Sequence, residues 1–88
     1  MSKLVNLTGS EKQIAWAESI RASFYEQSAN APEKNKQIIT EIFNRKSEAK
    51  WWIDEIQNKA IISLIEVMTK CMDFNTPDEL QNYLISKM

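Results

Sequence analysis

The stretch "AKWWIDEIQ", residues 49–57, places two tryptophans side by side. Neighbouring residues on an α-helix point about 100° apart, so Trp51 and Trp52 cannot both enter one narrow core stripe. Apolar residues continue beyond this stretch at spacings of three and four, which predicts one long helix over residues 47–72. On that helix Trp52 faces the core and Trp51 projects toward the opposite side. The predicted core stripe holds Ala49, Trp52, Ile53, Ile56, Ala60, Leu64, Val67 and Cys71.

The same helical spacing recurs in three further segments, at residues 9–27, 32–45 and 77–87. Two of them begin with a T-x-x-E sequence, "TGSE" and "TPDE", which predicts a capping box at each helix start. Glycine and proline are too scarce for the many turns of an all-β chain. We therefore predict an all-α fold, a small bundle of about four helices with a long central third helix. The first helix is predicted to bury Trp16, Ala17, Ile20 and Phe24.

A chain of 88 residues predicts a single helical domain over residues 1–88. Residues 1–7 are expected to form a flexible arm, although Leu4, Val5 and Leu7 could fold back onto the bundle. No apolar run approaches the roughly 20 residues of a membrane span, and the N-terminus lacks the apolar segment of a signal peptide. We expect a cytoplasmic protein that does not enter a membrane.

Several kinds of catalytic and metal chemistry lack the residues they need. The sequence has no histidine, which is the commonest general base and the commonest metal ligand. Its one cysteine, Cys71, cannot form an internal disulfide or a structural zinc site. Its one glycine excludes a phosphate-binding loop. We expect no enzyme activity, no cofactor and no metal, and Cys71 is predicted to be an inert core residue.

A second apolar stripe on the predicted long helix is the candidate binding surface. Trp51 has an azimuth similar to that of Ile62, and Ile65 lies nearby. Either the last helix and the N-terminal arm cover this stripe, or part of it stays open as a partner-binding or homodimer surface. Tryptophan is enriched at binding hot spots, which keeps the open patch in consideration. The candidate partner-binding residues are Trp51, Ile62 and Ile65.

Nucleic acid is the alternative ligand. The segment "EKNKQIITEIFNRKSEAK" carries five basic residues, with acids between them. A DNA-reading helix normally presents a denser basic face, and the net charge of −1 gives no general attraction to phosphate. We therefore expect a solvated surface here, with nucleic-acid binding as the alternative. The residues concerned are Lys34, Lys36, Arg45, Lys46 and Lys50.

Two stretches, "LTGSEKQIAWAESIR" and "AKWWID", resemble together a short helical module of proteins from bacteria, their phages and mobile elements. The first matches the pattern L-T-G-x-x-K-Q-x-x-W-A-x-x-I-R, and the second matches a downstream W-W-I-D element. The module brings no established activity. The resemblance implies a phage or mobile-element origin and contact between Trp16 and the Trp51–Trp52 turn. It also makes Arg21 and Asp54 candidates for an ion pair.

These observations predict a non-enzymatic helical module that binds a larger protein. The suspected origin makes that partner a host protein, with a defence nuclease as the specific case, so that the chain would act as an anti-CRISPR-like inhibitor. The alternatives are a helical nucleic-acid-associated module and a structural homodimer. The salt dependence of binding distinguishes the nucleic-acid alternative from protein binding, because contacts to phosphate weaken steeply as the salt concentration rises.

Overall fold

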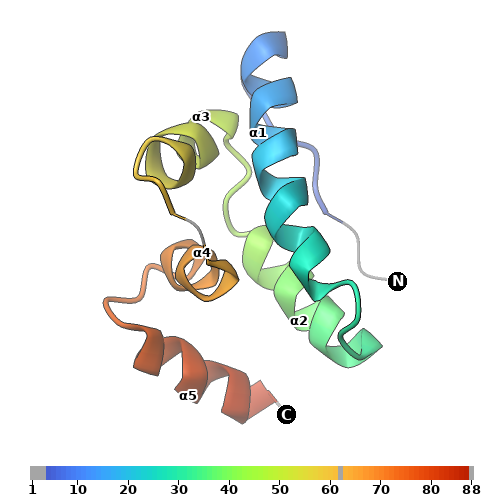
Figure 1. Ribbon diagram of the computed structural model, residues 1–88, viewed down its shortest axis with the longest axis vertical. Helices are drawn as coiled ribbons and strands as arrows, with labels where there is room; N and C mark the ends of the chain where they lie inside the picture. The colour runs from blue at the N-terminus through green and yellow to red at the C-terminus, as the bar shows by residue number, and fades with distance from the viewer. Residues whose placement is uncertain (1–3, 62, 88) are drawn as a thin grey trace.

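The computed structural model describes residues 4–61 and 63–87, and this part of the chain is predominantly helical and contains no strand. The all-α prediction is confirmed. The α-helices are shown in Figure 1 and are joined by a short 3₁₀-helix and a π-helix. The elements in order are α1 (Glu11–Tyr25), the 3₁₀-helix η1 (Glu26–Ser28), α2 (Glu33–Phe43), α3 (Ala49–Trp51), the π-helix η2 (Trp52–Gln57), α4 (Leu64–Cys71) and α5 (Pro77–Lys87).

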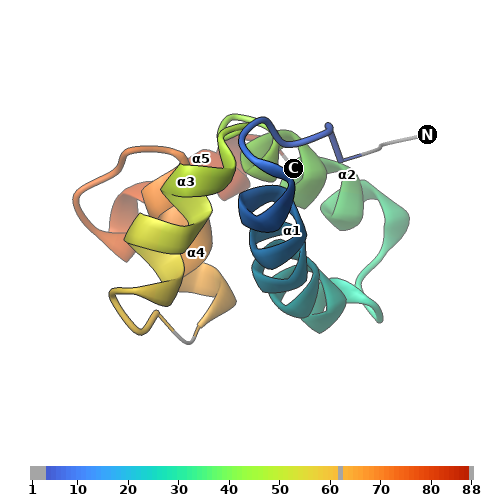
Figure 2. The same ribbon diagram turned by 90° about the horizontal axis from the view of Figure 1, so that it is seen from above.

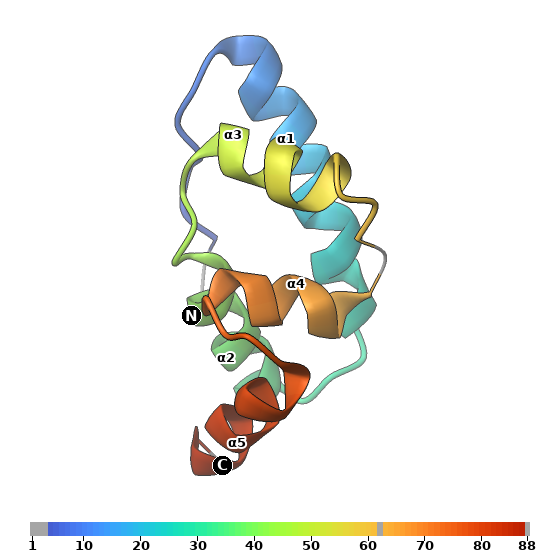
Figure 3. The same cartoon turned by 90° about the vertical axis from the view of Figure 1, so that its left-hand side faces the viewer.

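The helices form two groups around one core. Seen from above, α1 and α2 lie on one side and α3, α4 and α5 on the other (Figure 2). Both α3 and η2 pack against α1, whereas α4 packs against α2 and α5. Figure 3 shows α3, α4 and α5 following one another down the length of the molecule. The element that was predicted to be one central helix is therefore divided between two packing positions.

The predicted long helix over 47–72 is wrong, because the chain breaks between η2 and α4. Ala60 has a left-handed backbone with φ of 54°. The amide of Ile61 donates to the carbonyl of Ile56, and the amide of Ala60 donates to Gln57. These two bonds make a Schellman motif, which ends a helix by satisfying its last carbonyls. After the break, the hydroxyl of Ser63 caps the start of α4.

The end of α4 uses the same motif. Asp73 is left-handed with φ of 60°, the amide of Phe74 donates to Thr69, and the amide of Asp73 donates to Lys70. Glycine is the usual residue at such a position because it has no Cβ. Here alanine and aspartate occupy the two positions. The end at Met72 agrees with the predicted end of the helix, whereas the break at Ala60 has no glycine or proline to mark it.

The start of α1 differs from the predicted TGSE capping box. Ser10 is the N-cap, and Ser10 and Gln13 form the capping box with each other. Thr8 instead exchanges backbone bonds of 2.9 Å with Ser47 and Ala49, which join the N-terminal segment to the start of α3. Gly9 between them has φ of +144°, and a Cβ there would lie 3.3 Å from that of Ala49. Glycine at this position therefore lets Thr8 bond to the start of α3 while Ser10 caps α1.

The other helix boundaries agree closely with the sequence pattern. The fourth predicted helix matches α5, which begins at Pro77, and the carboxylate of Glu79 accepts from the amide of Asn75. The first two predicted helices extend past α1 and α2 by a few residues at most. Each of these segments has an uninterrupted apolar stripe, so the local sequence places each helix to within a few residues.

The segment before α1 folds back onto the bundle. Leu7 is buried, and Leu4 is partly buried against the core. The buried guanidinium of Arg21 donates to the carbonyl of Val5 over 2.8 Å, and the amide of Val5 donates to Asn44. From residue 4 onward the predicted arm is thus held by backbone bonds and by one buried leucine.

Replacing Ala60 with glycine tests the break between η2 and α4. A left-handed backbone costs a residue with a Cβ about 1–2 kcal/mol, so Ala60→Gly should raise the free energy of unfolding by roughly 0.5–1 kcal/mol. In one continuous helix the same substitution would cost about 1 kcal/mol. Urea denaturation shows whether Ala60→Gly raises or lowers the free energy of unfolding. Gln37→Gly, on the exposed side of α2, is the matched control and should destabilise.

Candidate functional site

A chain of aromatic rings links the core to the surface. Tyr25 contacts Phe43 with ring centroids 6.0 Å apart, and Phe43 contacts Trp52 at 5.2 Å. Trp52 then contacts Trp51 at 5.2 Å, edge to face. The indole of Trp52 is fully buried, and its N–H donates to the carbonyl of Lys46 over 2.9 Å. The two adjacent tryptophans therefore have different environments, one in the core and one at its edge.

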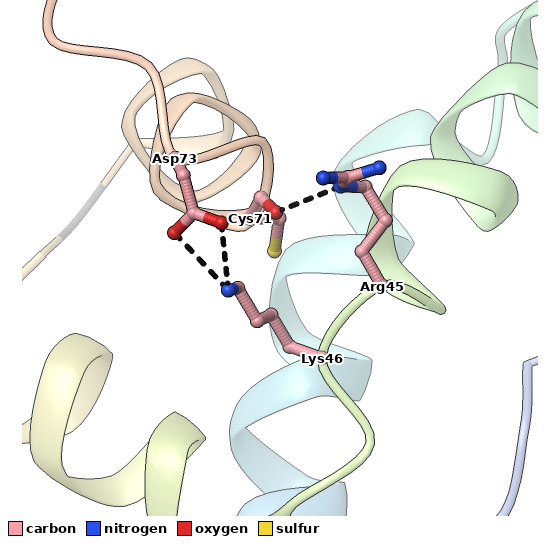
Figure 4. A network of polar contacts seen from close by, with 4 residues as sticks. All are labelled: Arg45, Lys46, Cys71 and Asp73. Carbon is pink, nitrogen blue, oxygen red and sulfur yellow. Dashed lines mark hydrogen bonds and ion pairs between the residues drawn. The ribbon is translucent and has the colours of Figure 1, made fainter.

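Trp51 lies at that edge beneath a lysine. The ammonium of Lys46 stands 5.5 Å from the ring centroid of Trp51 and bridges to both carboxylate oxygens of Asp73. Figure 4 shows this ion pair beside a second contact, in which Nε of Arg45 donates to the carbonyl of Cys71 over 3.3 Å. The two cations follow α2, while their acceptors stand at the end of α4. We call these two contacts, Lys46 with Asp73 and Arg45 with Cys71, the clasp. The clasp holds the segment between α2 and α3 against α4.

Trp51 also borders two polar hollows on the surface. One, of about 250 Å³, is lined by Glu55, Lys70, Asp73 and Phe74 in addition to Trp51. The other, of about 240 Å³, is lined by Arg45, Lys46, Ser47 and Glu48 beside Trp51. Both mix acidic and basic side chains, so neither presents a surface of one charge to a ligand.

A second, apolar surface lies between α2, α4 and α5. One hollow of about 180 Å³ and an adjacent one of about 350 Å³ share Ile65 and Leu84. Ile65 is 50% exposed, although it is a large aliphatic residue. We call this surface the Ile65 groove. Its lining residues are Asn35, Ile38, Ile39, Leu64, Ile65, Met68, Pro77, Leu80, Gln81 and Leu84.

The structure separates the predicted partner-binding residues. Trp51 lines the polar hollows and Ile65 lines the apolar groove, so the two belong to different surfaces. Ile62 lies outside the described residues. Helix α5 covers part of the predicted second stripe through Leu80, which is buried, but leaves Ile65 half-exposed. Sequence reasoning missed the contribution of Leu84 and the α2 isoleucines, because only the fold brings α2 and α5 together.

The predicted basic stretch does not form one free surface. Arg45 and Lys46 make the clasp, and Lys46 is largely covered. Lys34 and Lys36 lie in the first turn of α2, and the α-helical rise separates them from the end of the helix, which Arg45 follows, by roughly 10–14 Å along the axis. Lys50 is exposed on α3. The five bases are therefore spread over both ends of α2 and the helix that follows.

The predicted junction between α1 and the Trp51–Trp52 turn is present, because α3 and η2 both pack against α1 and Ala17 is buried. Trp16 itself is 51% exposed, and the ring of Trp51 contacts Trp52 and the ammonium of Lys46. The expected pair of Arg21 with Asp54 is replaced by the bond from Arg21 to the N-terminal segment. Burial lowers the pKa of the Arg21 guanidinium, an effect that Glu18 partly offsets. The ion pairs of the described residues are Lys46–Asp73 and Lys59–Glu55.

No protein-family model, curated protein or solved structure matches this chain. Within residues 4–61 and 63–87, no group of three or more His, Cys, Asp or Glu side chains could hold a metal ion. Over the same two ranges, every helix is too short or too polar to cross a bilayer.

The tryptophan pair gives a stability test. Trp52→Phe removes the donor to Lys46 and leaves a cavity, so it should lower the free energy of unfolding by about 2–4 kcal/mol. Trp51→Phe keeps a ring beneath the ammonium and should cost less than about 1 kcal/mol. Thermal melting resolves the two, because 1 kcal/mol moves a domain of this size by roughly 4–8 °C. Equal losses of unfolding free energy in the two variants would contradict the different burial of Trp51 and Trp52.

Cys71 gives a second test. Burial raises the pKa of this thiol to about 12, so almost no reactive thiolate exists at pH 8. A thiol reagent should label the native protein very slowly and the urea-unfolded protein rapidly. The unfolded sample is the matched control, since the chain has one cysteine. Rapid native labelling at pH 8 would show that the core opens at this position.

Proposed function

We propose that this protein is a binding module without catalytic activity of its own, which holds an apolar segment of a larger protein in the Ile65 groove. The half-exposed side chain of Ile65, set between two apolar hollows, is the observation that carries this proposal. Contiguous exposed apolar surface with a polar edge is typical of interaction sites. Polar atoms at the edge come from Asn35 and Gln81.

The shape of the groove favours a helical ligand. Three helices line it, and its wall consists of branched aliphatic chains and Met68, which adapt to an inserted side chain. An amphipathic helix presents apolar residues at i, i+3 and i+4, which could enter the two adjacent hollows on either side of Ile65. The uncharged amides at the edge can bond to polar groups of the ligand without requiring an opposite charge.

A host protein is the proposed partner, and a defence nuclease is the specific case. The resemblance of the N-terminal stretch and the "AKWWID" element to a module of phage and mobile-element proteins supports this choice. The proposed mode of action is binding alone, by which a small chain can cover a functional surface of a larger protein or hold that protein in an inactive conformation. The nucleic-acid alternative has less support, since Arg45 and Lys46 are engaged within the molecule.

Two substitutions to lysine test the proposal. Ile65→Lys places a charge in the groove, whereas Ile85→Lys places one on α5 at a residue that is 62% exposed and lines neither hollow. A partner captured from the native host and then purified should bind Ile65→Lys at least about tenfold more weakly than wild type. Ile85→Lys should bind within about twofold of wild type.

The proposal fails if Ile65→Lys, shown by melting to be folded, binds the purified partner as well as wild type does. It also fails if nuclease digestion of the lysate, or moderate salt, abolishes capture, because a phosphate-mediated contact would then account for the association. In that case Lys50→Glu should weaken binding while Ile65→Lys leaves it unchanged.

A further inference from the structure

The solvent side of α1 carries an aromatic residue that the predicted bundle would have buried. Ala17, Ile20 and Phe24 face the core, and the opposite side of the helix is centred on Ser19. Trp16 lies on that side and is 51% exposed. We call this surface the Trp16 face. Its residues, all exposed, are Lys12, Ala15, Trp16, Ser19, Ala22, Ser23 and Glu26.

The order of side chains on this face is symmetric about Ser19. Lys12 stands as far before Ser19 as Glu26 stands after it. Trp16 precedes Ser19 by three residues and Ser23 follows it by four, and both lie on the same edge of the face. A large ring is thus matched by a small side chain, and a base by an acid, at nearly equal distances from the centre. Such a surface is complementary to itself when a second copy runs in the opposite direction.

We infer that α1 pairs with α1 of a second copy of this chain, antiparallel, about a two-fold axis at Ser19. In this arrangement each Lys12 lies opposite the partner's Glu26, and each Trp16 ring lies over the partner's Ser23, on the same edge of the contact. Small side chains at these positions let two helices approach to about 8–10 Å. A parallel pair would instead set Lys12 against Lys12 and Glu26 against Glu26, so the charges select the antiparallel orientation.

The second copy has a consequence for binding. Every residue that lines the Ile65 groove belongs to α2, α4 or α5, so pairing through α1 leaves both grooves open. The dimer therefore presents two equivalent binding surfaces. That bivalency rests on the proposed function, whereas the dimer itself does not.

Charge exchange in solution tests the pairing. Lys12→Glu and Glu26→Lys each set like charges opposite one another, so each should weaken dimerisation at least about tenfold in sedimentation equilibrium. The double variant restores opposite charges and should restore the dimer. An acid near the start of α1 and a base near its end both suit the helix dipole, so neither single variant should unfold the chain. Lys50→Glu, off this face, is the control and should dimerise like wild type.

Cross-linking tests the orientation. The two-fold axis brings both copies of residue 19 within disulfide distance, so Ser19→Cys should form a covalent dimer on mild oxidation. Ala15→Cys should not, because its own counterpart lies further along the helix. A wild-type chain that stays monomeric at millimolar concentration overturns the inference. Failure of the double charge exchange to restore the dimer, or equal cross-linking at residues 15 and 19, does so as well.

Discussion

The bond from the indole of Trp52 to the carbonyl of Lys46 is the constraint on which the rest of the structure depends. A fully buried tryptophan must find an acceptor for its N–H, and here the acceptor is the carbonyl of Lys46, in the link that follows α2. This bond turns that link against the core, which sets α3 and η2 on α1. The same turn carries the side chain of Lys46 outward over Trp51 and toward Asp73.

Two further connections hold the same link from other directions. Thr8 bonds to the backbone on either side of Glu48, and Arg45 bonds to the end of α4. The short segment between α2 and α3 therefore joins the N-terminal segment, the core and α4. A core of this size contributes little hydrophobic free energy to stability. Such backbone connections therefore make up a larger share of the stability than in a larger domain. They also account for the two adjacent tryptophans. The indole of Trp52 bonds to the carbonyl of Lys46, and the ammonium of Lys46 lies over the ring of Trp51.

The remaining surface divides into two parts with different chemistry. The Ile65 groove is an apolar hollow whose edge is uncharged, which suits an apolar segment of another protein. The Trp16 face carries an exposed indole among small side chains, with Lys12 and Glu26 at its ends, which suits the proposed antiparallel pairing with a second copy. A ligand for one would find no complement at the other, and this separation lets the two proposals be tested by independent substitutions.

Local sequence determined the all-α fold class, where α1, α2 and α5 lie, and that Trp52, Val67 and Cys71 are buried. Each of these follows from side-chain spacing along one segment. Tertiary structure decided the break at Ala60, the exposure of Trp16 and the separation of Trp51 from Ile65. A left-handed alanine is stable only when the elements on both sides pack in different places. Likewise, an apolar residue at the edge of a helix is buried only if another helix packs over it. The spacing of residues within one helix does not show which other helix packs there.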